Sequence, residues 1–171
     1  MMTHDPVELV PYDPQWPEAF RRIRDRLIVL LPQALSIDHI GSTSISGMSA
    51  KPLIDIDIVL PGRGHIEDAT DVLLAEGYEP RGNRHDDEVW AFLSRGSVPR
   101  ERVYLCPLGN GTHRNRLAFR DYLIVHPQAA AEYAALKRRL AAEFRMEGDH
   151  YTAHKREFVD TIVARALTGD D

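Results

Sequence analysis

Two aspartates with one residue between them are the side chains in this sequence most suited to chemistry. Asp55 and Asp57 lie in the run LIDIDIVL at residues 53–60, in which two sets of side chains alternate. Alternate side chains of an extended strand point to the same face, so both carboxylates share one face. Their Cα atoms would lie roughly 6.5 Å apart, within reach of one divalent ion or a close pair of ions. We therefore expect Asp55 and Asp57 to be catalytic residues that hold Mg²⁺ or Mn²⁺ against a phosphate.

A loop rich in glycine and serine precedes this run. It reads HIGSTSISG at residues 39–47. Glycine lets the backbone approach a ligand closely, and exposed amides form an anion site. We expect Gly41, Ser42 and Thr43 to bind the oxygens of a triphosphate, with Lys51 beside them as a balancing cation. Lys51 could equally be a solvated surface side chain.

The rest of the sequence predicts the elements that must position these residues. Apolar residues at spacings of three and four predict helices, and alternation predicts strands. Two of the later strands should form a hairpin. In chain order we expect a helix at 14–31, strands at 35–40 and 52–60, a helix from 66 to the glycine at 77, strands at 88–94 and 102–106, and helices at 117–125, 127–144 and 152–167.

These elements predict an α+β fold, a small mixed sheet flanked by helices with a helical C-terminal third. We expect residues 1–171 to form a single domain, because no repeat or linker divides them. The net charge of -5 argues against direct nucleic-acid binding. One cysteine, Cys106, leaves no internal disulfide and fits a cytoplasmic protein. No run reaches the roughly 18 apolar residues of a membrane helix, so we expect no membrane partner.

Several separated motifs closely resemble the signature of the GrpB family, whose members look like proteins of the nucleotidyltransferase superfamily. The matching segments are HIGSTSISG at 39–47, AKPLIDID at 50–57, YDPQWP at 12–17, FRDYL at 119–123, His126-Pro127, Tyr133, Leu136, Lys137, Tyr151 and Lys155. The resemblance covers nearly the whole chain. It implies a nucleotidyltransferase-like sheet in which the Gly-Ser loop faces two metal-binding aspartates. Family members also occur fused to a dephospho-coenzyme A kinase, which points to nucleotide or coenzyme chemistry.

The helical third contributes further candidates for nucleotide binding. Lys137 and Lys155 match the family pattern, and Tyr133 and Tyr151 stand four residues before them. Residues four apart share a helix face, so a phosphate and a stacked base could be contacted together. We expect Arg120, Lys137, Tyr151 and Lys155 to contribute to this site. The alternative is aromatic packing between helices, with the lysine stems lying over the rings.

A third carboxylate is expected near the two aspartates, because the superfamily site has one on a neighbouring strand. Glu88, at the start of a predicted strand, is a candidate metal ligand, and Glu101 is another. On the strand at 102–106 the family commonly carries histidines, whereas this chain has Arg102 and Tyr104. Tyrosine, with an ordinary pKa of about 10, is a poor magnesium ligand near neutral pH. If that strand faces the aspartates, only two acidic ligands remain.

The motifs together predict a metal-dependent, nucleotidyltransferase-like protein that binds a nucleoside triphosphate and transfers a nucleotidyl group to an acceptor that the sequence does not name. The competing prediction is a catalytically inactive nucleotide-binding or protein-interaction module with the same fold. A third carboxylate converging on Asp55 and Asp57 would favour the enzyme, and a strand presenting only Tyr104 would favour the module. An Asp-x-Asp strand on its own could also be a solvated sheet face. We expect His39 to form structural hydrogen bonds rather than to act as a base.

Overall fold

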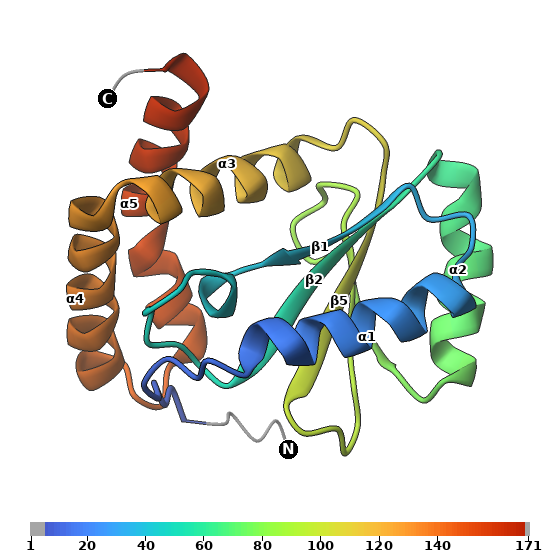
Figure 1. The fold of residues 1–171 in the computed structure, drawn as a ribbon, viewed down its shortest axis with the longest axis horizontal. Helices are drawn as coiled ribbons and strands as arrows, with labels where there is room; N and C mark the ends of the chain where they lie inside the picture. The colour runs from blue at the N-terminus through green and yellow to red at the C-terminus, as the bar shows by residue number, and fades with distance from the viewer. Residues whose placement is uncertain (1–5, 170–171) are drawn as a thin grey trace.

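A five-stranded mixed sheet with helices against both faces forms the centre of the computed structural model, which describes residues 6–169 (Figure 1). In chain order the elements are α1 (Trp16–Leu30), β1 (Ser36–Ile40), the 3-10 helix η1 (Ser42–Ser44), β2 (Leu53–Leu60), the 3-10 helix η2 (Arg63–His65), α2 (Ile66–Ala75), β3 (Glu79–Gly82), β4 (Trp90–Leu93), β5 (Arg100–Pro107), α3 (Gly111–Val125), α4 (Pro127–Glu143) and α5 (Gly148–Thr168). The strand order is β1-β2-β5-β4-β3, with β2 and β5 parallel and the other neighbours antiparallel. The α+β class and the helical C-terminal part are confirmed.

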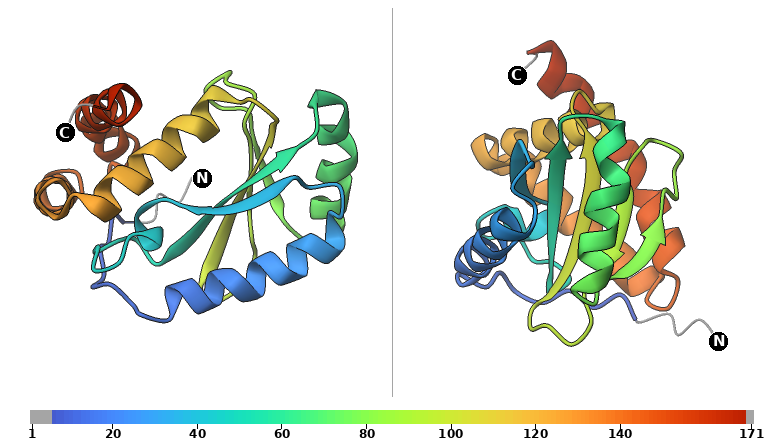
Figure 2. Two further views of the ribbon diagram at one scale, coloured as in Figure 1. Left: turned by 45° about the horizontal axis from the view of Figure 1, so that its top comes forward. Right: turned by 90° about the vertical axis from the view of Figure 1, so that its right-hand side faces the viewer.

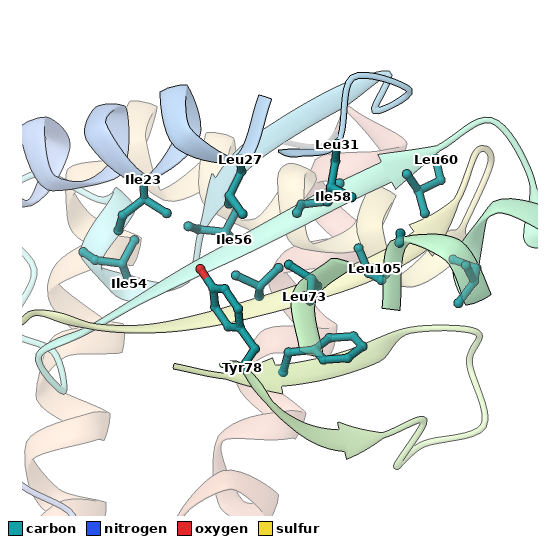
Figure 3. Packing of buried hydrophobic residues seen from close by; sticks show 14 of the residues in the cluster. Ile23, Leu27, Leu31, Ile54, Ile56, Ile58, Leu60, Leu73, Tyr78 and Leu105 are labelled. Carbon is teal, nitrogen blue, oxygen red and sulfur yellow. The ribbon is translucent and has the colours of Figure 1, made fainter. Parts of the chain in front are cut away.

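β2 owes its orientation in the sheet to its alternating sequence. One set of its side chains is fully buried and consists of Ile54, Ile56, Ile58 and Leu60. This set packs against Leu27 of α1 and Leu73 of α2, as Figure 3 shows. Burying each such side chain stabilises the fold by about 1.5–3 kcal/mol, which fixes the orientation of the strand. Asp55 and Asp57 must therefore point to the opposite face of the sheet.

The C-terminal helices cover this opposite face. In the left panel of Figure 2 the sheet lies between α3 and α1, with α4 and α5 grouped beside α3. A second apolar core joins Ile45 and Met48, which follow η1, to Tyr122 of α3, Tyr133 of α4 and Ile162 of α5. The helical third is thereby packed directly against the segment that follows the Gly-Ser loop.

Two helices begin earlier than the sequence pattern predicts. α3 begins at Gly111 rather than at 117, and the side chain of Asn110 caps it by accepting a hydrogen bond from the backbone of His113. α5 begins at Gly148 rather than at 152. These first turns are mostly polar, so apolar periodicity does not reveal them. The predicted hairpin of β4 and β5 is confirmed, and β3 adds a strand that was not predicted.

None of the helices among residues 6–169 is both long enough and apolar enough to cross a membrane.

Candidate phosphate-binding pocket

A cavity of about 180 Å³ lies between the Gly-Ser loop, the sheet and helices α4 and α5. Its charged lining residues are four cations and one carboxylate, namely Lys51, Arg102, Lys137, Lys155 and Asp55. Ser42, Thr43 and Tyr151 also line it. We call this cavity the pocket, and Lys51, Lys137 and Lys155 the pocket lysines. The structure thus brings together most of the residues expected to bind phosphate, from four separate parts of the chain.

Lys137 of α4 is fully buried beneath the Gly-Ser loop. Its ammonium group donates to Ser42 Oγ at 2.9 Å and to the carbonyl oxygen of Ser49 at 2.5 Å. It also lies 5.0 Å from the centre of the Tyr133 ring. Burial, and then the charge of Lys155, lower the pKa of Lys137 to about 7. Lys137 therefore ties the loop to α4, and an anion in the pocket would favour its charged form.

The other two pocket lysines flank one buried tyrosine. The ammonium groups of Lys51 and Lys155 lie 5.0 Å and 4.4 Å from the centre of the Tyr151 ring. Burial lowers the pKa of both, to about 8 in Lys155, where the charge of Lys51 adds to the effect. Neither ammonium group forms an ion pair within the part of the chain that the structure describes. Their positive charge is therefore available to a ligand.

Asp55 is the acidic residue of the pocket. It is the register partner of Arg102 on β5, whose Nη1 lies 3.8 Å from Asp55 Oδ1. That oxygen is buried and has no hydrogen-bond partner among the described residues. Burial raises the pKa of Asp55, and the charge of Arg102 opposes this rise. Gly41 lets the loop pack here, because its φ is +73° and a Cβ atom would lie 2.8 Å from Asp55 Oδ2.

Asp57 faces α3 instead of the pocket. Its Oδ1 accepts a hydrogen bond from Arg116 Nη1 at 2.7 Å, and its Oδ2 lies 2.9 Å from His113 Nδ1. The other ring nitrogen of His113 lies 3.3 Å from Oδ2 of Asp38, the register partner of Asp57 on β1. The guanidinium of Arg116 also lies 4.2 Å from the centre of the Tyr104 ring. Asp57 is 1% exposed, and both of its oxygens are engaged.

Sequence reasoning missed the partners of Asp57. His113, Arg116 and Arg120 are spaced by three and four residues, which places them on one helix face. This signal was available, but a helix predicted to begin at 117 excluded the first two of them. Asp38 stands two residues before Ile40 on a predicted strand, so the two side chains could have been placed on the same face.

Like Asp57, the expected site residues Gly41, Glu88 and Arg120 do not line the pocket. Glu88 precedes β4 with a φ of +57°, and its carboxylate pairs with Arg63 at 3.4 Å. Arg120 donates from Nη1 to the carbonyl oxygen of His39 at 2.9 Å and so fastens α3 to β1. The His39 ring lies 2.9 Å from Thr43 Oγ1, and burial, with the charge of Arg120, lowers its pKa to about 4. His39 thus supports the loop as a structural residue.

The side chains do not fit a magnesium ion in the arrangement seen here. Mg²⁺ requires near-octahedral oxygen ligands, whereas Arg116 and His113 already occupy both oxygens of Asp57. Across residues 6–169, no group of three or more His, Cys, Asp or Glu side chains is placed to hold a metal ion. β5 presents Arg102 and Tyr104 to the two aspartates. Within the pocket, Asp55 Oδ1 suits a cation because it has no hydrogen-bond partner among the described residues.

Comparisons with known proteins agree on one family. The family model described as GrpB protein matches residues 6–165. The UPF0157 protein YqkA of Bacillus subtilis is 36% identical over 161 residues, which are 94% of this chain and 47% of that protein. This chain therefore spans about half the length of the Bacillus relative.

Solved structures extend the comparison to the fold. The conserved protein GrpB from Enterococcus faecalis superposes with a TM-score of 0.84 and 28% identity, covering 95% of this chain and 98% of that one. A cytoplasmic RNA terminal U-transferase matches with a TM-score of 0.50 and 14% identity, covering 77% of this chain and 40% of that one. The nucleotidyltransferase-like sheet expected from the sequence is confirmed at the level of the fold.

Proposed function

The chain belongs to the GrpB family, and from this premise we propose that it binds a nucleoside triphosphate with the phosphates in the pocket. The observation that carries the proposal is the excess of positive charge, four cations against the single carboxylate of Asp55. Ammonium and guanidinium groups are the side chains that bind phosphate oxygens best. Ligand pockets commonly measure about 300–1,000 Å³. A cavity of about 180 Å³ therefore suits the phosphates, with the nucleoside outside.

Tyr151 supports this site by positioning cations. The sequence suggested that its ring could stack on a base, but Tyr151 is 1% exposed and two pocket lysines lie against its ring. A cation over an aromatic face is stabilised by about 0.5–2 kcal/mol. The ring therefore holds Lys51 and Lys155 at the pocket without requiring a carboxylate partner, which would compete with a phosphate.

The test uses ATP binding by calorimetry, with two neighbouring substitutions in α5. Lys155→Met removes a cation that lines the pocket, and Arg156→Met removes one from the exposed side of the same helix. We expect Lys155→Met to weaken ATP binding by about tenfold or more, and Arg156→Met to leave it within about twofold of the wild type. AMP should bind more weakly than ATP, since one phosphate engages fewer lysines. Equal effects of the two substitutions would contradict a specific pocket.

Nucleotidyl transfer is the second candidate function. It is favoured by the fold shared with a terminal U-transferase and by the Asp55 oxygen that has no partner among residues 6–169. With Mg²⁺ or Mn²⁺ at Asp55 and Asp57, it would require the release of Asp57 from α3. Pyrophosphate release from ATP or UTP, measured with RNA ends and small hydroxyl acceptors, tests it. Pyrophosphate release that Asp55→Ala abolishes would support nucleotidyl transfer. ATP binding without pyrophosphate release would support the catalytically inactive binding module instead. The positions of Arg102 and Tyr104 opposite the two aspartates favour this module.

A further inference from the structure

Each of the two aspartates of β2 faces an arginine. Arg116 donates to Asp57 at 2.7 Å, and Arg102 lies 3.8 Å from Asp55. Carboxylates beside a triphosphate repel it unless a cation neutralises them, and the repulsion is strong where water is excluded. Here the protein supplies one guanidinium for each carboxylate. The charge of the pocket lysines is therefore not consumed by the aspartates and is left for the ligand.

We propose that the pocket binds the phosphates of its ligand without a divalent cation, because Arg102 and Arg116 neutralise the two aspartates. This inference rests on the proposed function. Arginine suits the role because its guanidinium stays charged at any ordinary pH and donates in a fixed plane to a carboxylate. Asp57 is then a positioning residue that orients α3, and it does not touch the ligand.

The contacts around Arg116 oppose its replacement by a metal ion. Its guanidinium is held between the carboxylate of Asp57 and the ring of Tyr104, at 2.7 Å from the oxygen and 4.2 Å from the ring centre. His113 occupies the second oxygen of Asp57 from the same helix. A metal bound by Asp57 would have to displace both side chains, each of which is already partnered.

The helix that carries these side chains is itself fastened to the loop before β4 and to β1. Near its start, Asn110 Nδ2 donates to the carbonyl oxygen of Asp87 and Thr112 Oγ1 donates to Asp87 Oδ2, both at 2.8 Å. Further along, Arg120 donates to the carbonyl oxygen of His39 at 2.9 Å. Opening Asp57 by moving α3 as a unit would break these bonds as well. Neutralisation of Asp57 by α3 is thus built into the fold.

The experiment measures the Kd of ATP by calorimetry in excess EDTA and in excess Mg²⁺. For the wild type we expect the two values to agree within about threefold. Arg116→Met leaves Asp57 without its counter-ion, so ATP should bind weakly in EDTA and Mg²⁺ should restore binding by about tenfold or more. Arg114→Met, at an exposed position of the same helix, is the matched control and should behave as the wild type.

A second variant protects the test against misfolding. Asp57→Asn combined with Arg116→Met removes both opposite charges, so no carboxylate is left unpaired, and the ratio of the two Kd values should return to within about threefold. Wild-type binding that appears only with Mg²⁺ would overturn the metal-free inference and leave the proposed function standing. Failure of ATP to bind under either condition would overturn the proposed function itself. A ratio unchanged by Arg116→Met would overturn the role given to Arg116.

Discussion

Asp55 and Asp57 stand two residues apart on one face of β2, yet their surroundings have little in common. Asp57 is 1% exposed and held by two side chains of α3, whereas Asp55 lines the pocket with an oxygen that lacks a hydrogen-bond partner in the described chain. The difference arises because α3 packs over Asp57 while the Gly-Ser loop, α4 and α5 surround Asp55. Equivalent strand positions thus acquire separate roles from the helices that cover them.

The largest expected effect is on stability and separates the two aspartates directly. Asp57→Asn should lower the free energy of unfolding by about 3 kcal/mol, because it leaves the partly buried Arg116 without its carboxylate. Asp55→Asn should cost no more than about 0.5 kcal/mol or stabilise the protein, because Asp55 Oδ1 accepts no hydrogen bond from the described residues and Arg102, 3.8 Å away, is more exposed than Arg116. Urea denaturation at neutral pH measures both. Similar losses of unfolding free energy in the two variants would contradict the different surroundings of Asp55 and Asp57.

A substitution at Gly41 tests how closely the Gly-Ser loop packs against Asp55. Gly41→Ala should cost about 2–3 kcal/mol, since its φ is +73° and the added Cβ would meet Asp55 Oδ2 at 2.8 Å. Gly47→Ala is the matched control: its φ is +80°, but nothing lies within 4 Å of the added atom. It should cost about 1 kcal/mol, from backbone strain alone. Equal costs in thermal or urea unfolding would show that the loop does not pack tightly on Asp55.

Lys137 gives the stability of the pocket side a pH dependence. Burial lowers its pKa to about 7 in the folded protein, against about 10.4 in an unfolded chain. Between about pH 7 and pH 10 the unfolded state therefore binds a proton that the folded state lacks. The stability of the ligand-free protein should rise with pH in this window, by up to about 1 kcal/mol per pH unit from this group.

Two measurements check this expectation. Denaturation in phosphate-free buffers at about pH 7 and pH 9 should show a smaller rise in Lys137→Met than in the wild type. ATP should bind more weakly at about pH 9 than at about pH 7, because it favours the charged forms of Lys137 and Lys155. An identical rise in both proteins would contradict the burial of an ionisable lysine.

Arg120 should show the smallest effect on binding. It fits the sequence pattern of a phosphate ligand, but it lies outside the pocket and donates to the carbonyl oxygen of His39. Arg120→Met should leave the Kd of ATP within about twofold of the wild type and cost about 1 kcal/mol of stability. Binding weakened as much as in Lys155→Met would extend the pocket to α3.

The local parts of this architecture could be predicted from the sequence. The alternation of β2 predicted its position and its two faces, because four fully buried side chains fix that orientation. The loop glycine was identified from its neighbours, and the lysines of α4 and α5 from the family resemblance. Each of these predictions depends on a pattern within a few residues or on several motifs in order.

The partners of Asp57 could not be predicted in the same way. His113 and Arg116 lie 56 and 59 residues from it in sequence and come from a polar helix turn. Which carboxylate they meet is decided by how α3 crosses the sheet. Glu88 was predicted to begin a strand. Its φ is positive, so Glu88 is not extended, and β4 begins only at Trp90.

The distribution of the pocket cations has a consequence for folding. They come from the segment before β2, from β5, from α4 and from α5, which ends only at Thr168. A nascent chain on the ribosome therefore exposes an incomplete pocket until α5 has been synthesised and has docked. Any ligand held by all four segments would bind only after that docking, and would slow hydrogen exchange in α5 and in β2 together.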